Sequence, residues 1–374
     1  MGRILTPVAR RSALSQVRHV SPVRPGAARD LVAGVYEQAE RDFGMLAPPV
    51  ILHSPAPESL AACWLMLRES LLAHGTVNRA IKEMVAAAVS LGNTCPYCVD
   101  VHSATLGGLA RGRYAAEIAG DRIEAIPDPG VRRIAAWARA SGTRETAARH
   151  DLPLPAEQVA ELVGVAVTFQ YFNRMVNVFL DESPVPPQVP AGVRPGLMRL
   201  LGLFMRPAAR RVHTPGASVD LLPAAPPPAD LSWSDGTANI AEAFARAAAA
   251  IDRGGRRSVP EPVRDLVTAE LAAWNGAPTG LSRAWVTDAV SGLPAAQRPA
   301  GRLALLTAMA SYQVDQSVID EFRRVEPGDR TLIELASWAS LAAARRIGSW
   351  APPVRPDSPR QAAPEGCPVA ARIS

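Results

Sequence analysis

Helical periodicity is the feature of this sequence that most constrains its fold. Residues 57–75, 79–93 and 156–180 repeat apolar side chains at three- and four-residue intervals, which places those side chains on one face of an α-helix. Clear alternation of apolar and polar residues, the pattern of a half-buried strand, is absent. The sequence therefore predicts an all-α protein.

Length and hydropathy favour a globular protein with two domains. The chain has 374 residues, of which 48% are hydrophobic, and this length is more typical of two domains than of one. Arg, Gly or Pro interrupts the longest apolar runs well before the roughly 20 residues that a bilayer requires. The first 20 residues are basic but lack the apolar core of a signal peptide. We therefore expect no membrane span and a cytoplasmic location.

Charge and cysteine content argue against a nucleic-acid-binding protein and against a disulfide-rich one. The net charge is +5, Lys82 is the single lysine, and no run of basic residues is interleaved with aromatic ones, so we expect no nucleic-acid partner. Four cysteines are too few for a disulfide scaffold. Cys63 lies in an apolar helical pattern and Cys367 in a Pro-rich segment, and we expect both to be bystanders.

Pro-rich stretches divide the chain into two halves. We predict a first domain over residues 1–181, a connector over 182–232, a second domain over 233–351 and a disordered tail over 352–374. The connector contains one apolar and basic helical segment, residues 196–212. This segment could bind a membrane surface or a partner, but Pro207 shortens it and favours a helix packed on its own domains.

The second half resembles the first. Residues 77–93 align with residues 259–275, and Glu83 then corresponds to Asp265. Residues 165–179 also resemble residues 305–319, at a different offset. The similarity is weak but keeps its order along both halves, so two tandem copies of one helical domain are the simplest explanation.

Residues 93–102, NTCPYCVDVH, hold two cysteines and a histidine at helical spacing. With Pro96 in the first turn of a helix that begins near Cys95, the side chains of Cys95, Cys98 and His102 lie on one face. The helix N-terminus is expected to favour the thiolate, and the imidazole one turn below Cys98 can accept the thiol proton. The second copy has Ala277, Gly280 and Ala284 at the three corresponding positions, which indicates that only the first copy carries the chemistry.

Glu83 lies on the preceding predicted helix and can reach this site if the two helices pack together. It would then orient or protonate His102 and complete a carboxylate–imidazole–thiol relay. In this arrangement Cys98 is the better activated thiol and Cys95 its resolving partner. Asn173 and Arg174, in the segment QYFNRMVNVF, are expected to be buried polar anchors or interface groups and not part of the chemistry.

The pattern E-x11-C-x2-C-x3-H on two consecutive helices, here Glu83, Cys95, Cys98 and His102, resembles that of the AhpD-like alkylhydroperoxidases of the carboxymuconolactone decarboxylase superfamily. The resemblance covers about residues 55–182, and the second half is similar only as a degenerate copy. It implies an all-helical bundle that forms homo-oligomers, and a trimer of this double chain would imitate a hexamer.

The same resemblance implies a peroxidase. In such an enzyme Cys98 would attack the peroxide, Cys95 would close the disulfide, and Glu83 and His102 would relay protons, with neither metal nor flavin. A lipoylated or other dithiol protein would return the electrons. Some members carry a second histidine where this chain has Tyr97, and a phenol cannot act as a base near neutral pH.

Other interpretations of the same residues stay open. The two thiols, His102 and Glu83 could instead hold a metal ion, or the cysteines could be inert core residues. At the level of function, the alternatives are a redox sensor or scaffold whose thiols oxidise once, and a decarboxylase-type member. The decarboxylase is disfavoured because that branch of the superfamily does not use a cysteine pair, whereas this chain keeps both thiols.

Overall fold

The computed structural model describes residues 10, 13–110, 114–147, 152, 154–185, 188–190 and 192–351. Throughout this part the chain is helical, and its only β-type pairing is an isolated bridge between Ala73 and His213. The predicted all-α class is confirmed. None of the helices in this part is both long enough and apolar enough to cross a bilayer. The tail predicted to be disordered, with Cys367, lies outside the described residues.

The first half builds a helical bundle around α5. Its longer helices are α2 (Asp30–Asp42), α4 (Pro57–Leu67), α5 (Arg79–Gly92), α6 (Pro96–Leu109), α8 (Pro129–Ala140) and α10 (Ala156–Phe179), and its shorter ones are α3 (Pro48–Ile51), α7 (Ala115–Ala119) and α9 (Arg144–Ala147). Helix α5 packs against α6, α8 and α10. Because three helices surround it, nearly all of its side chains are buried, including Lys82 and Glu83.

Local sequence explains where the two site helices begin and end. The side chain of Asn78 caps α5 by accepting a hydrogen bond from the backbone N–H of Ile81 at 3.0 Å. The helix stops at Gly92, and Thr94 takes a left-handed conformation with φ of 52°. Pro96 then opens α6 at its first position, with Cys95 as the N-cap. The tight turn places α6 directly beside α5.

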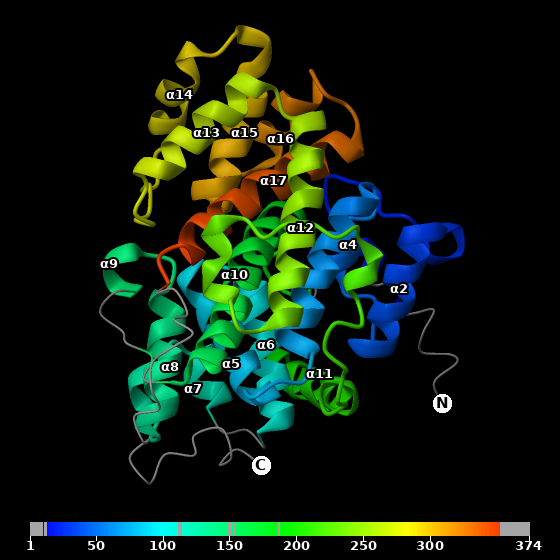
Figure 1. The fold of residues 1–374 in the computed structure, drawn as a ribbon, viewed down its shortest axis with the longest axis vertical. Coiled ribbons are helices and arrows are strands. Elements are labelled where there is room, and N and C mark those ends of the chain that lie inside the picture. Colours follow the sequence, from blue (N-terminus) through cyan, green and yellow to red (C-terminus); the bar gives the residue numbers. More distant parts are fainter. Residues whose placement is uncertain are drawn as a thin grey trace.

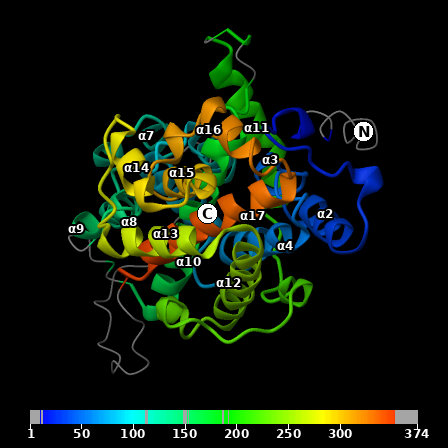
Figure 2. The same ribbon diagram turned by 90° about the horizontal axis from the view of Figure 1, so that it is seen from above.

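The second half is also built of helices. It contains α12 (Ala238–Ser258), α13 (Glu261–Ala273), α14 (Ala284–Ala289), α15 (Arg298–Met309), α16 (Gln316–Arg323) and α17 (Asp329–Gly348). By the predicted alignment of residues 77–93 with residues 259–275, α13 corresponds to α5. Helix α4 packs against α12 and α10 against α17 (Figures 1 and 2), so two long helices of the first half each contact a long helix of the second.

One of the predicted internal similarities aligns two segments that have different secondary structure. Residues 165–179 lie inside the single long helix α10, whereas residues 305–319 span the end of α15, a short 3-10 turn and the start of α16. The wrong alignment arose because apolar spacing is similar in any two buried helical segments.

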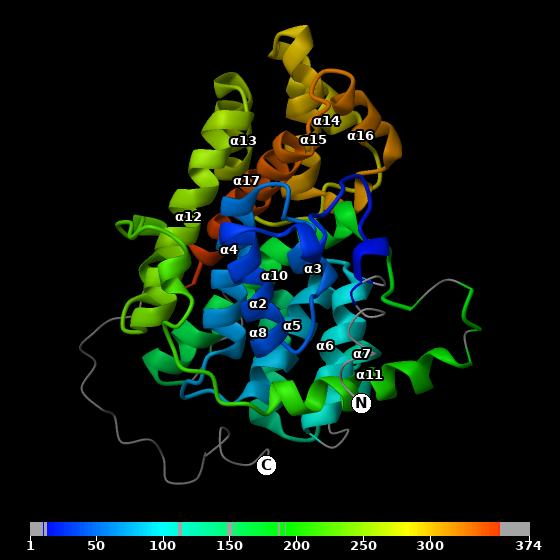
Figure 3. The same ribbon diagram turned by 90° about the vertical axis from the view of Figure 1, so that its right-hand side faces the viewer.

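The predicted connector helix forms as α11 (Arg194–Ala209), with Pro207 in its last turn. Figure 3 shows α11 crossing the base of the molecule, and it packs chiefly against α6. The contact is close because two glycines meet there. A Cβ atom added to Gly202 would lie 2.2 Å from the carbonyl oxygen of Ala104, and one added to Gly108 would lie 2.4 Å from that of Gly202. The connector helix is therefore packed on the protein's own first half.

Candidate active site

The two cysteines lie at the corner between α5 and α6. The backbone N–H of Cys95 donates to the carbonyl oxygen of Ser90 at 3.0 Å, which ties the start of α6 to the last turn of α5. Cys98 is in the first turn of α6, and the exposed fractions of Cys95 and Cys98 are 1% and 3%. Both thiols are free in this structure.

Glu83 and His102 form a buried pair across the α5–α6 contact, as the spacing predicted. Nδ1 of His102 lies 2.6 Å from Oε2 of Glu83, and the guanidinium of Arg79 binds the other carboxylate oxygen, with Nε donating at 2.7 Å. Burial by itself would raise the pKa of Glu83, but the charges of Arg79 and His102 hold that pKa below its usual value. The carboxylate is therefore ionised and accepts from Nδ1–H, which leaves Nε2 of His102 as the nitrogen that can exchange protons with a ligand.

The environment of Cys98 differs from the expectation that the helix N-terminus would favour its thiolate. A hydrogen bond with the Cys95 thiol and burial together raise the pKa of the Cys98 thiol well above its ordinary value. The Asn173 and Ser90 side chains act in the opposite direction but do not offset them. The Cys95 thiol and burial therefore outweigh the small favourable effect that a helix N-terminus has on a thiolate.

Asn173 is part of this site, although the sequence assigned it only an anchoring role. Its side chain is fully buried, donates to Oγ of Ser90 at 2.9 Å and accepts from Nδ2 of Asn93 at 2.9 Å. It also lies close enough to Cys98 to lower the pKa of that thiol. An amide within the otherwise apolar stretch of α10 was the available signal, but only the packing of α10 against α5 brings it to the thiol. Arg174, its neighbour, is buried and donates to the carbonyl oxygen of Ala308 at 2.8 Å, as expected of an anchor.

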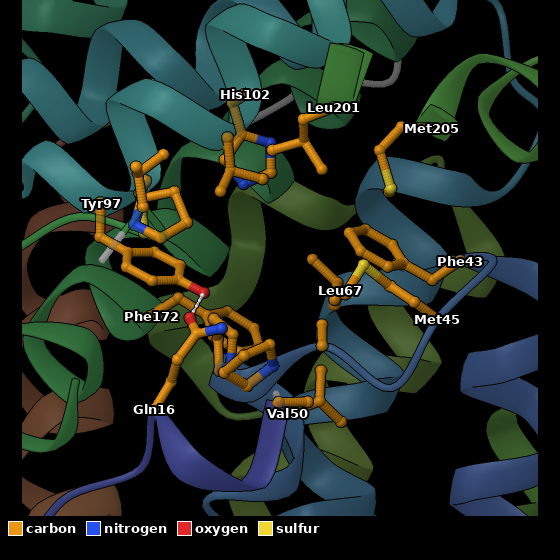
Figure 4. A pocket seen from close by; sticks show the side chains of 18 of the residues that line it. Gln16, Phe43, Met45, Val50, Leu67, Tyr97, His102, Phe172, Leu201 and Met205 are labelled. Carbon is orange, nitrogen blue, oxygen red and sulfur yellow. Dashed lines mark hydrogen bonds between the residues drawn. The ribbon is translucent and has the colours of Figure 1, made fainter. Parts of the chain in front are cut away.

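Tyr97 is a neutral hydrogen-bond donor. Its hydroxyl donates to Oε1 of Gln16 at 2.9 Å, and burial raises its pKa far above the physiological range. It therefore links the N-terminal segment to the start of α6 (Figure 4) and does not act as a base.

A cavity of about 330 Å³ opens in front of Cys98 and His102. Figure 4 shows His102 beside Leu201 on one side of it and Phe43 and Met45 on another. Cys98, His102 and Tyr97 line this cavity, whereas Cys95 is not among the described residues that do. A ligand in the cavity would thus meet Cys98 first, with Cys95 behind it at the helix cap.

Within the described residues, the structure also bears on Cys63 and on the alternative of a metal site. Cys63 is fully buried and donates to the carbonyl oxygen of Leu60 at 3.1 Å, which fits the expected core position. In this part of the chain no three His, Cys, Asp or Glu side chains gather as a metal site requires. Both carboxylate oxygens of Glu83 are occupied by Arg79 and His102.

The second half lacks every part of the site. Asp265, which aligns with Glu83, is exposed, and Ala277 and Gly280 lie in the loop between α13 and α14. Helix α14 (Ala284–Ala289) is much shorter than α6, so the second half has no equivalent of the helix that carries the thiols.

Comparisons with known proteins agree with these features. The sequence pattern of the carboxymuconolactone decarboxylase family matches residues 58–140, from α4 to the end of α8. A protein of Mycobacterium tuberculosis named alkyl hydroperoxide reductase is 37% identical over 336 residues, which cover 89% of this chain and 94% of that protein. The similarity therefore extends through both halves.

Among solved structures, this chain is similar to the AhpD alkylhydroperoxidase core of an uncharacterized peroxidase-related protein from Ralstonia eutropha JMP134. The two are 20% identical, the match covers 49% of this chain and 98% of that one, and the TM-score is 0.36. The long match to the mycobacterial relative and the family pattern over α4–α8 lead to one conclusion: the chain belongs to the carboxymuconolactone decarboxylase family.

Proposed function

We propose that this protein reduces hydroperoxides through a dithiol–disulfide cycle of Cys98 and Cys95, with Glu83 and His102 as the proton relay. The observation that carries the proposal is that a cavity is lined by both Cys98 and His102, while Nδ1 of His102 is held by the buried carboxylate of Glu83 at 2.6 Å. The printed name of the mycobacterial relative, an alkyl hydroperoxide reductase, supports the same reaction class.

In the first step Nε2 of His102 takes the proton of the Cys98 thiol, and the sulfur attacks the terminal oxygen of the hydroperoxide. The O–O bond breaks, the proton passes from His102 to the departing alkoxide, and an alcohol leaves. Cys98 becomes a sulfenic acid. The ionised Glu83 stabilises the imidazolium that exists between the two proton transfers.

In the second step the thiol of Cys95 attacks the sulfenic sulfur of Cys98, and water leaves as the disulfide forms. A dithiol donor then reduces the disulfide by exchange and restores both thiols. We propose a lipoylated or similar dithiol protein as this donor, and a homo-oligomer as the working assembly. Both follow from the family resemblance and stay predictions.

Turnover of cumene hydroperoxide with dihydrolipoamide as donor tests the cycle. Cys98→Ser should lower turnover by at least about 1,000-fold because the attacking sulfur is lost. Cys95→Ser should react once, stop at the sulfenic acid and fail to turn over, with the products followed by protein mass. Cys63→Ser, at a buried cysteine outside the cavity, is the control and should retain turnover. A single oxidation of the wild type without turnover would favour the redox-sensor alternative.

The same assay tests the relay. Glu83→Gln should lower kcat by about 100-fold, in the range typical of lost acid–base catalysis, because the amide no longer stabilises the imidazolium. Asp265→Asn, at the exposed corresponding position of the second half, should leave kcat unchanged. Equal effects of the two substitutions would contradict a relay through Glu83.

A further inference from the structure

A second cavity, of about 370 Å³, lies between the two halves of the chain. The first half contributes the ends of α5 and α8 and part of α10, and the second half contributes the loop after α13, the end of α15 and the 3-10 turn that follows it. The cavity in front of Cys98 is mainly apolar, with Leu201 and Met205 of α11 in its wall. The described residues that line the two cavities are all different, so the second cavity is a separate site.

The walls of the second cavity are polar and carry positive charge. Arg139 and Arg174 both line it, and none of its described lining residues is Asp or Glu. Arg139 already has an anionic partner, because the carboxylate of Asp121 accepts two hydrogen bonds from it at 2.6 and 2.7 Å. Arg174 is therefore the source of uncompensated charge. The described lining residues with hydrogen-bonding side chains are Asn93, Thr94, Arg139, Thr143, Arg174, Trp274, Ser311 and Tyr312.

The protein satisfies the guanidinium of Arg174 only in part. Nε donates to the carbonyl oxygen of Ala308 at 2.8 Å, and Nη1 donates to the backbone carbonyl and to Oε1 of Gln170 at 2.6 and 2.9 Å. Among the described residues no acceptor is paired with Nη2. Arg174 is only 6% exposed, burial lowers its pKa to about 10, and no described carboxylate opposes that shift. Since a buried charge is costly without a partner of opposite sign, an anionic ligand would stabilise this arrangement.

Two neighbours of Arg174 fit the remainder of such a ligand. The hydroxyl of Ser311 accepts a hydrogen bond from Nδ2 of Asn177 at 3.1 Å, so its own proton can be donated to a ligand. The ring centroid of Trp274 lies 6.0 Å from Cζ of Arg174 and offers an apolar face to a hydrocarbon body. One guanidinium nitrogen and one hydroxyl match the two oxygens of a carboxylate. A phosphate group, with a charge of about −1.5 to −2, would exceed the single cation available.

From these observations we propose that the cavity between the halves binds a small organic carboxylate. The carboxylate group pairs with Arg174 and Ser311, and the body of the ligand lies against Trp274. Because Arg174 belongs to the first half and the other two residues to the second, the ligand joins the two halves. The volume of about 370 Å³ suits a ligand of this size, and the site does not depend on the proposed peroxide reaction.

Isothermal titration calorimetry of the full chain with benzoate and with benzamide tests this site. The two probes have the same shape, but only benzoate is charged. Benzoate should bind with a Kd on the order of 1 mM or below and at least about tenfold more tightly than benzamide, as expected of a charge-assisted hydrogen bond. Arg174→Gln should weaken benzoate binding at least about tenfold. Arg324→Gln, at an exposed arginine of the second half that does not line the cavity, should bind benzoate as the wild type does.

Three results would overturn the proposal. They are a wild type that binds benzoate no more tightly than benzamide, unchanged benzoate binding in Arg174→Gln, and tighter binding of inorganic phosphate than of benzoate. Arg174 also anchors α10 to α15, so Arg174→Gln is first checked by circular dichroism. If its helical signal is lost, Ser311→Ala replaces it and should weaken benzoate binding about tenfold, and unchanged binding in that variant would equally refute the site.

Discussion

At the residue scale, the site shifts the pKa values of its thiol and its carboxyl group in opposite directions. Glu83 is as deeply buried as Cys98 but is held by two cationic or hydrogen-bonding partners, Arg79 and His102. Cys98 has no cationic partner among the groups that shift its pKa, and the neighbouring Cys95 thiol disfavours its ionisation. The two groups are similarly buried, but their pKa values shift in opposite directions because only Glu83 is paired with a cationic group. In the proposed mechanism the proton must therefore leave Cys98 during the reaction, through His102.

The raised pKa of Cys98 predicts how its alkylation depends on pH. A thiol whose pKa lies above the ordinary value of about 8.5 is protonated near neutral pH, so the rate of alkylation by iodoacetamide should still be rising at pH 9. Cys95→Ala removes the largest cause of the shift and should move the profile to lower pH. The measurement is the alkylation rate of Cys98 from pH 6 to 10, followed by peptide mass. A rate in the wild type that levels off below pH 7 would be inconsistent with this account.

At the element scale, the position of α11 depends on its contact with α6. Neither Gly108 nor Gly202 has space for a Cβ atom, because backbone carbonyl oxygens occupy it at 2.4 Å and 2.2 Å. Backbone atoms cannot move aside as the end of a flexible side chain can. The pair therefore allows the two helices to approach closely, and this approach determines where Leu201 and Met205 stand in the cavity.

A matched pair of substitutions on α11 tests this contact. Gly202→Ala should lower the free energy of unfolding by about 1–3 kcal/mol, the usual cost of overpacking. Gly196→Ala lies on the same helix with nothing within 4 Å of the added Cβ. It should be neutral or should stabilise by up to about 1 kcal/mol, because Ala favours a helix over Gly. Urea unfolding measures both, and equal stability of the two variants would refute the close contact.

At the scale of the whole molecule, the two halves share one hydrophobic core. The buried cluster is continuous from Trp64 on α4 to Phe244 on α12, and from Tyr171 on α10 to Leu335 on α17. The hydroxyl of Tyr171 also donates to Oγ of Ser337 across the contact at 3.1 Å. The division into domains over residues 1–181 and 233–351 stays a prediction, but the helices of both segments pack into one core.

A continuous core predicts one cooperative unfolding transition. Leu335→Ala, at a fully buried position of the second half, should destabilise the protein by about 2–5 kcal/mol. The peroxide reactivity of Cys98, which lies in the first half, should be lost at the same lowered temperature as the helical signal. Leu281→Ala, in the second half at 95% exposure, should shift neither. Calorimetry with two separate transitions, only one of them moved by Leu335→Ala, would mean that the halves fold independently.

Much of the fold and part of the site follow from local sequence. Apolar spacing predicted the all-α class, and the pattern of Glu83, Cys98 and His102 placed three side chains on two consecutive helices that the structure packs together. The all-α class and the shared face of Cys98 and His102 depend on neighbours within one or two helical turns, where the geometry is set by the helix itself. The contact of Glu83 with His102 also needs α5 and α6 to pack together. The failed alignment of residues 165–179 shows the limit of such patterns, because apolar periodicity does not distinguish one buried helix from another.

The sequence by itself therefore determined the helices, the connector and the identity of the thiol, imidazole and carboxylate groups. Only the tertiary structure decided the direction of the Cys98 pKa shift, the contact of Asn173 with that thiol and the apolar cavity walled by α11. The physical reason is that desolvation and cavity shape arise from segments far apart in the chain, so a residue's nearest neighbours along the chain carry no information about them.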